Sequence, residues 1–162
     1  MKHSIMVAIT SQENTYTKFR NLLELDGLDH NIKVKLSLAI AEDCVKGMAP
    51  LTASDLDNVN NYLLGVKDWF DTGVVPYSPA FTGSPVAKLY SITRNLDAII
   101  RQKDSLYSLP YYLINLIKNS PNFIGAQLLQ EDEHIITTYY SVLLDLISEH
   151  YKMDLTIPRL LY

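Results

Sequence analysis

The sequence predicts an all-α protein, and three observations support that fold class. Apolar residues recur at spacings of three and four, the period of an α-helix, in most segments between the breaker residues. Ser, Thr or Asp stands before several of these segments, at the position of a helix N-cap. Hydrophobic residues make up 48% and charged residues 20% of the chain, which is typical of a folded protein. We therefore expect a single domain, residues 1–162, built as a bundle of six or seven helices.

Residues 31–48 are expected to form a buried helix at the centre of the bundle. Apolar side chains cover nearly its whole circumference, and only Lys35, Glu42 and Lys46 form a continuous polar strip. A helix with so narrow a polar face is normally surrounded by neighbours. Asp29 stands where it can cap the start of this helix.

One helix and a non-helical arm are expected ahead of the central helix. Residues 1–9 contain an apolar run too short to predict a helix, so we expect a short strand or an apolar arm. Thr10 and Glu13 have the spacing of a capping box, after which helical spacing continues as far as Gly27.

A third helix should begin at Thr52 or Ser54 and end at Gly73, a residue type that often terminates helices. A loop over residues 74–85 follows, with three prolines, one glycine and two aromatic residues, Tyr77 and Phe81. The apolar face of the helix is expected to consist of Leu56, Val59, Leu63, Val66 and Phe70.

The next helix should start at Ser84–Pro85, a favourable cap and first-turn pair, with Arg94, Asp97 and Arg101 on its outer side. A shorter helix is expected over residues 109–119. Residues 120–152 are interpreted as one bent helix or two separate helices. The end of the chain, 153–162, should be a short non-helical arm docked on the core, because it is too apolar to be left in water.

The composition argues against two classes of partner. The formal net charge of −4 disfavours nucleic acid, whose phosphates require clustered Lys and Arg. No apolar run approaches the roughly 18 residues that a membrane span needs.

The single cysteine, Cys44, cannot form an internal disulfide, and the first residues do not have the pattern of a signal peptide. A cytoplasmic location is therefore expected.

The usual motifs of catalysis and metal binding are missing from the sequence. Glu131 and His134 have the Glu-x-x-His spacing of di-iron bundles, but the second such motif is lacking. Cys44 lies on the apolar side of the central helix without a histidine at a neighbouring helical position, so we expect a buried hydrophobe. We assign no catalytic, cofactor-binding or metal-binding residue.

Asp43 is the charged residue that breaks the apolar pattern of the central helix. On a helical wheel it lies on the side of Ile32 and Leu36, where a carboxylate would be partly desolvated. We interpret Asp43 as a buried polar anchor whose charge is met by an Arg or a helix start, as a residue on a side that is simply exposed, or as a polar point in a groove. The candidate partners for its charge are Arg20, Arg94 and Arg101.

Residues 36–73 resemble the first helical pair of a family of small all-helical immunity proteins, found in bacterial toxin loci and in phages. The matching elements are Ala41-Glu42-Asp43-Cys44, similar to a small-x-Asp-Cys pattern, and Lys67-Asp68-Trp69 before Gly73. The resemblance covers about a quarter of the chain, and the spacing from Trp69 to Gly73 is one residue longer than the family's. It implies a helical protein that binds a partner, and it transfers no catalytic residue.

The sequence therefore favours a non-enzymatic protein-interaction module, an inhibitor or immunity-type factor of bacterial or phage origin. The eleven tyrosines fit this reading, since interfaces favour tyrosine, and Tyr77 and Phe81 are the expected partner contacts. One alternative is a self-assembling structural component whose tyrosines pack against other copies. Another is a small enzyme or ligand-binding bundle, with Asp43 or the Glu131/His134 pair at its site.

Overall fold

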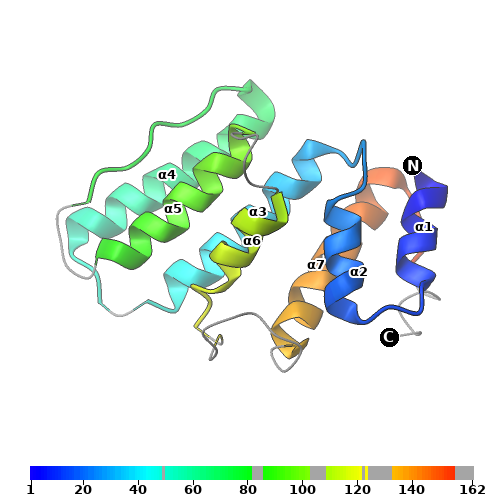
Figure 1. Ribbon diagram of the computed structural model, residues 1–162. Helices are drawn as coiled ribbons and strands as arrows, with labels where there is room; N and C mark the ends of the chain where they lie inside the picture. The colour runs from blue at the N-terminus through cyan, green and yellow to red at the C-terminus, as the bar shows by residue number, and fades with distance from the viewer. Residues whose placement is uncertain (49, 82–85, 103–108, 122, 124–132, 156–162) are drawn as a thin grey trace. The chain divides into compact units, whose positions relative to one another are not determined.

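The computed structural model describes every residue except 49, 82–85, 103–108, 122, 124–132 and 156–162. Its described residues form seven helices and no strand, which confirms the all-α fold class (Figure 1). The helices are α1 (Lys2–Thr10), α2 (Thr15–Leu23), α3 (His30–Lys46), α4 (Ala53–Thr72), α5 (Val86–Ile100), α6 (Leu109–Ile117) and α7 (Glu133–Tyr151).

The chain divides into two compact units, and the division falls inside α3. The first unit consists of residues 1–36 and 124–162, so it combines both ends of the chain. Within it, α2 packs against α1 and α7. Asp29 joins α3 to the end of α7, because its carboxylate lies 3.6 Å from Nε2 of His150 and its backbone N–H donates to the hydroxyl oxygen of Tyr151 at 3.0 Å.

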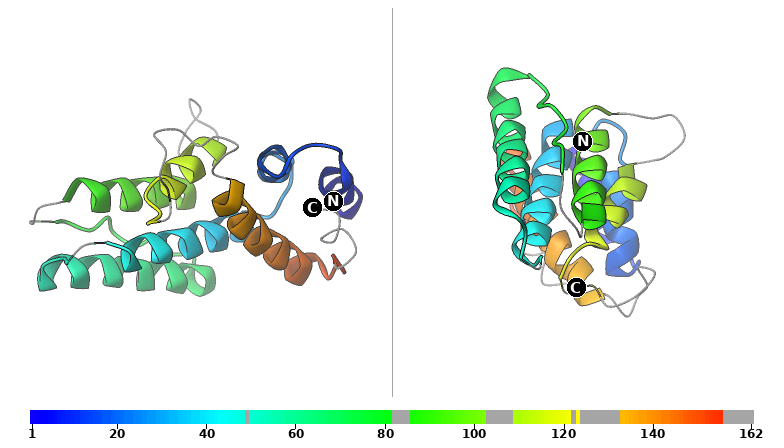
Figure 2. Two further views of the ribbon diagram at one scale, coloured as in Figure 1. Left: turned by 90° about the horizontal axis from the view of Figure 1, so that it is seen from below. Right: turned by 90° about the vertical axis from the view of Figure 1, so that its left-hand side faces the viewer.

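The second unit, residues 37–123, contains the second half of α3 together with α4, α5 and α6. Helices α5 and α6 lie side by side, and α4 lies on the side of the unit away from α6 (Figure 2). The described part of the α4–α5 connection, residues 74–81, is fixed at two points. Nδ2 of Asn58 donates to the carbonyl of Ala80 at 2.8 Å, and the Arg101 guanidinium donates to the carbonyl of Pro76 at 3.4 Å.

The apolar circumference predicted for the central helix, residues 31–48, is confirmed in α3. Its inward positions are fully or almost fully buried, and Lys35 and Lys46 of the predicted polar strip are exposed. This burial follows from the sequence pattern, because apolar residues on all sides of a helix gain free energy only when neighbours cover them. The buried apolar residues of α3 are Ile32, Val34, Leu36, Leu38, Ile40, Ala41 and Cys44.

Three predicted helix ends are also confirmed. The Asp29 side chain accepts from the backbone N–H of Asn31 at 2.8 Å at the start of α3. Thr52 caps α4 in the same way, accepting from the N–H of Asp55 at 3.1 Å. Gly73 ends α4 in the left-handed conformation (φ 71°), which glycine adopts without steric cost.

The prediction of a non-helical N-terminal arm was wrong. Residues 2–10 form α1, whose Ile5 and Ile9 lie one turn apart and are completely buried. The predicted capping box at Thr10 does not form, because Thr10 is the last residue of α1. Asn14 caps α2 instead, accepting from the N–H of Thr17 at 2.8 Å.

Two positions were assigned to the wrong side of their helices. Leu56 was predicted on the apolar face of α4, but it is exposed and Asp55 takes the buried position. Asp97 was predicted on the outer side of α5, but only 8% of it is exposed. Arg101, which directly follows α5, neutralises this buried carboxylate through contacts of 3.0 and 3.1 Å.

Some predictions fall outside the described residues, including the Ser84–Pro85 cap, Glu131, the question of one or two helices before residue 133, and the final seven residues of the predicted C-terminal arm. Residues 153–155, which precede that end, are not helical, and Leu155 is buried. Over the parts of the chain that are described, no helix combines the length and the apolar character that crossing a membrane requires.

Candidate functional site

An open groove lies between α5 and α6 in the second unit. Its volume is about 560 Å³. Two of its tyrosines, Tyr90 and Tyr111, are 40% and 44% exposed, a large area for aromatic side chains to leave in water. We call this feature the tyrosine groove. Its lining residues are Ala87, Tyr90, Ser91, Arg94, Asn95, Tyr111, Tyr112 and Asn115.

Arg94 provides the positive charge of the tyrosine groove. Its guanidinium carbon lies 5.9 Å from the centre of the Tyr90 ring, within the range of a cation–π contact. Arg94 forms no ion pair with any residue that the structure describes. The planar donors of the guanidinium are therefore available to a carboxylate brought by a ligand.

Hydrogen bonds between and along the two helices hold the walls of the groove. The Asn119 amide, just beyond the end of α6, donates to the hydroxyl oxygen of Ser91 on α5 at 3.1 Å and to the carbonyl of Asn115 at 2.9 Å. On α5, the amide of Asn95 donates to the carbonyl of Ser91 at 2.6 Å. The groove is therefore largely formed before any ligand arrives, which lowers the entropic cost of binding.

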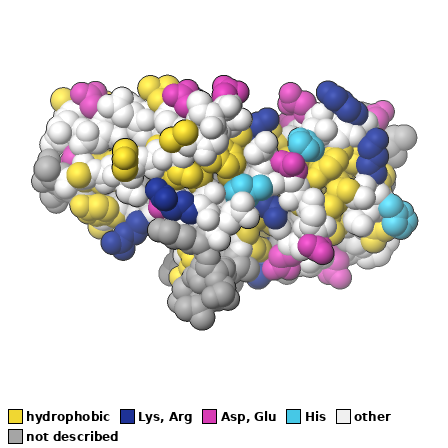
Figure 3. All heavy atoms as spheres, turned by 90° about the horizontal axis from the view of Figure 1, so that it is seen from above, with side chains coloured by type: hydrophobic (Ala, Val, Ile, Leu, Met, Phe, Trp, Pro, Cys, Tyr) yellow, Lys and Arg dark blue, Asp and Glu magenta, His cyan; other side chains and the backbone are white. Residues whose placement is uncertain are grey.

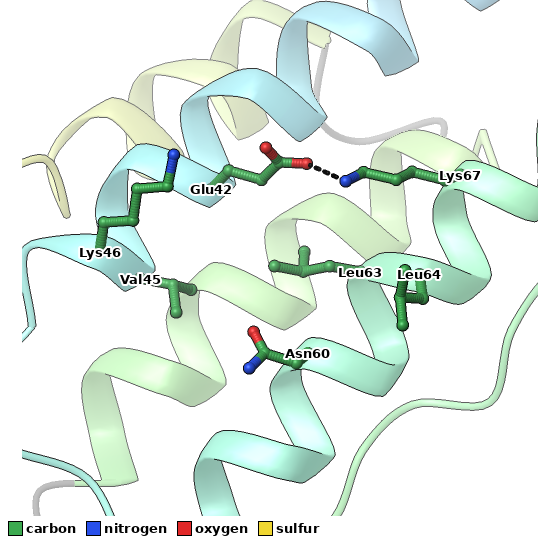
Figure 4. A pocket seen from close by; sticks show the side chains of 7 residues that line it. All are labelled: Glu42, Val45, Lys46, Asn60, Leu63, Leu64 and Lys67. Carbon is green, nitrogen blue, oxygen red and sulfur yellow. Dashed lines mark ion pairs between the residues drawn. The ribbon is translucent and has the colours of Figure 1, made fainter.

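A second, smaller groove of about 310 Å³ lies between α3 and α4. Figure 4 shows Glu42 of α3 and Lys67 of α4 meeting beside the apolar side chains of Val45, Leu63 and Leu64. The Lys67 ammonium lies 3.2 Å from the Glu42 carboxylate, so these two charges neutralise each other, and Lys46 is the remaining charged residue of the lining. The tyrosine groove combines the charge of Arg94 with exposed aromatic rings, so it is the better candidate for recognition.

The loop residues predicted as partner contacts have opposite environments. Tyr77 is 96% exposed, as a contact residue should be. Phe81 is only 8% exposed, and its ring packs edge-on against Tyr90 at a centroid distance of 5.5 Å. The prediction of a direct contact through Phe81 was therefore wrong. Phe81 instead supports the tyrosine that forms one wall of the groove.

The prediction that Asp43 is a buried anchor was also wrong, because Asp43 is exposed. Ile32 and Leu36 lie on the same side of α3 and are buried, so the covering of that side changes along the helix. The buried carboxylates of this unit are Asp55 and Asp97, and Asp97 has Arg101 as its partner. Helical periodicity does not show where along a helix its neighbours stop.

Cys44 has the environment of a structural residue. Its side chain is completely buried, and its thiol donates to the carbonyl of Leu116 at 3.5 Å. Burial is the main cause that raises the pKa of this thiol to about 12, and the Asp43 carboxylate raises it further while Lys88 lowers it. A thiol that stays protonated at neutral pH is a poor nucleophile and a poor metal ligand.

Clustered metal ligands are not found either. In the segments that the structure covers, no three His, Cys, Asp or Glu side chains come close enough to bind a metal ion together. The pair Glu131 and His134 is not covered by this statement, because Glu131 and the side chain of His134 are not described.

Sequence reasoning missed the tyrosine groove, although one signal pointed to it. Tyr90 and Arg94 are four residues apart and share the outer face of α5, a spacing at which side chains interact. The adjacent Tyr111 and Tyr112 fall inside the shorter helix that was predicted over residues 109–119. Their place beside Tyr90 depends on the packing of α5 against α6, which local spacing does not specify.

Comparison of the chain with protein-family models, with curated proteins and with solved structures found no match.

Proposed function

We propose that this chain is a non-enzymatic protein-interaction module whose tyrosine groove receives an acidic segment of a protein partner. The observation that carries the proposal is that Arg94 lies over the ring of exposed Tyr90 and forms no ion pair with a described residue. Arg and Tyr are the residue types that most often dominate the binding energy of interfaces. A carboxylate of the partner would pair with Arg94, and neighbouring apolar side chains would cover the tyrosine rings.

Tyr77 is a second proposed contact, because its ring is almost fully exposed while the backbone on either side is fixed to α4 and α5. A rigidly held aromatic side chain loses little conformational entropy on binding. The narrower role of an inhibitor or immunity-type factor is supported by the resemblance of residues 36–73. A cytoplasmic location is part of the proposal, and the free, buried Cys44 agrees with it.

Quantitative capture from a lysate of the source cells tests the proposal. Wild-type protein, Arg94→Glu and Lys2→Glu are immobilised at equal density, and the retained proteins are measured by mass spectrometry. Lys2→Glu is the control, because it makes the same change in net charge at an exposed position on α1. We expect a protein that wild type and Lys2→Glu retain and that Arg94→Glu retains about tenfold less.

The retained protein is then purified and titrated against the three baits, so that capture alone does not decide the question. Its affinity should fall about tenfold or more for Arg94→Glu and stay within about twofold for Lys2→Glu. Equal retention of every protein by all three baits would contradict the proposal.

A further inference from the structure

The outer face of α4 carries an acidic ridge in the same unit as the tyrosine groove. Five exposed residues follow one another at helical spacing along this face, over about 21 Å of helix. The central one is Leu64, which is 55% exposed. Figure 3 shows acidic side chains along this edge of the molecule with an apolar side chain among them. The acidic ridge consists of Asp57, Asn61, Leu64, Asp68 and Asp71.

The charges of the two features are complementary. Within its bounds, α4 contains four aspartates and one lysine. Helices α5 and α6 together contain one aspartate, the buried Asp97, against Lys88 and Arg94. Arg101, which directly follows α5, neutralises Asp97. The acidic ridge therefore complements the tyrosine groove. Its carboxylates carry the charge opposite to that of Arg94, and its exposed apolar side chain can cover the tyrosine rings.

The ridge and the groove of one molecule do not meet, since α4 lies on the side of the unit away from α6 (Figure 2). We infer that the partner segment in the tyrosine groove is the acidic ridge of a second copy of this chain. A single helix fits the groove between two other helices, as in helix-in-groove recognition. Leu64 would lie against Tyr90 and Tyr111, and Asp68 would reach Arg94. This inference rests on the proposed function and names its partner.

Such a contact is heterologous, because the two molecules use different surfaces. A dimer of this kind has a free groove on one molecule and a free ridge on the other. Further copies can therefore add to it, unless the molecules form a closed ring in which every groove is filled. We expect a weak contact, with a dissociation constant on the order of 100 μM, because one helix face in one groove is at the small end of protein interfaces. Added salt should weaken the contact because it joins opposite charges.

Sedimentation equilibrium of the full chain from about 10 μM to about 1 mM tests this inference. The wild-type mass should rise with concentration at about 50 mM salt and rise less at about 500 mM. Arg94→Glu damages the groove and Asp68→Lys damages the ridge, and each variant alone should associate at least about tenfold more weakly. Lys2→Glu and Asp43→Lys are the matched controls, exposed positions outside both features, and should behave like wild type.

Mixing the two variants distinguishes this contact from symmetrical packing. Association should return in an equal mixture of Arg94→Glu and Asp68→Lys, because the first keeps its ridge and the second keeps its groove. If the grooves packed face to face, Asp68→Lys would associate like wild type and the mixture would gain nothing, which would overturn the inference.

A wild-type chain that stays monomeric up to about 1 mM would also overturn the inference. The proposed function is judged separately, by the Arg94-dependent capture of another protein from a lysate. A monomeric chain that retains such a protein would contradict the second-copy partner and support the proposed function.

Discussion

The buried thiol of Cys44 couples the stability of the protein to alkaline pH. The pKa of the folded thiol is raised to about 12, whereas an unfolded cysteine ionises near pH ~8.5. Below about pH 8.5 both states keep the proton, so the thiol does not oppose folding there. As the pH rises from about 8.5 toward 12, only the unfolded state loses its proton. The free energy of unfolding therefore falls by about 1.4 kcal/mol per pH unit.

We predict that Cys44→Ala removes this part of the alkaline loss of stability. Urea denaturation between about pH 8 and pH 10 should show a free energy of unfolding that falls by about 2 kcal/mol for wild type and clearly less for the variant. At pH 7 the variant should itself be less stable by about 1 kcal/mol, because it leaves a small cavity. Equal pH dependence of the two proteins would contradict the assigned role of the thiol.

Tyr77 and Phe81 share one loop but should respond differently to truncation. Phe81→Ala removes a buried ring that packs on Tyr90, so we expect a loss of about 3 kcal/mol in the free energy of unfolding. Tyr77→Ala, its matched control at a 96% exposed position, should change stability by less than about 0.5 kcal/mol. Thermal or urea denaturation measures both, and a stable Phe81→Ala would mean that the ring is not part of the core.

At the scale of elements, Gly65 shows how a loop restricts a helix. Gly65 lies inside α4, where a change from glycine to alanine normally stabilises by about 1 kcal/mol. Here an added Cβ would lie 2.7 Å from Cβ of Pro76, whose ring cannot move without its backbone. The glycine therefore allows residues 74–81 to pack closely on the helix.

We predict that Gly65→Ala destabilises the protein by about 1–2 kcal/mol, the usual cost of overpacking. Asn61→Ala, at an exposed position one turn earlier on α4, is the control and should be neutral or slightly stabilising. Urea denaturation of the two variants provides the comparison. Stabilisation by Gly65→Ala would show that helix propensity outweighs the contact with the loop.

Local signals predicted the start of α3 and both ends of α4 correctly, because the residues that form these signals lie within or directly beside each helix. The caps Asp29 and Thr52 and the stop Gly73 each form bonds within a few residues. Helix α1 was not predicted, because its apolar run is too short to show helical spacing, and Val7 within that run is apolar although it is exposed. In a helix of only nine residues, one exposed apolar residue is enough to hide the helical pattern of apolar side chains.

At the scale of the whole molecule, α3 is shared between the two compact units. Helix formation is cooperative, so loss of the neighbours of either half should destabilise the other half as well. The single tryptophan, Trp69 on α4, reports on the second unit alone. Far-ultraviolet circular dichroism reports on all helices.

We therefore predict that the two signals give the same urea midpoint and a single transition, as the expected single domain requires. The Phe81→Ala variant, which weakens the second unit, should shift both signals together. A tryptophan transition that precedes the loss of helical signal would show instead that the two units unfold independently.

The sequence by itself determined the all-α class, the buried helix α3, the start of α3 and both ends of α4, because periodicity and capping act over a few residues. The tertiary structure alone decided that Asp97 is buried while Asp43 is exposed, that Phe81 lies inside, and that Tyr90 and Tyr111 share a groove. These outcomes depend on which helices become neighbours, and residue spacing along one helix carries no information about its neighbours.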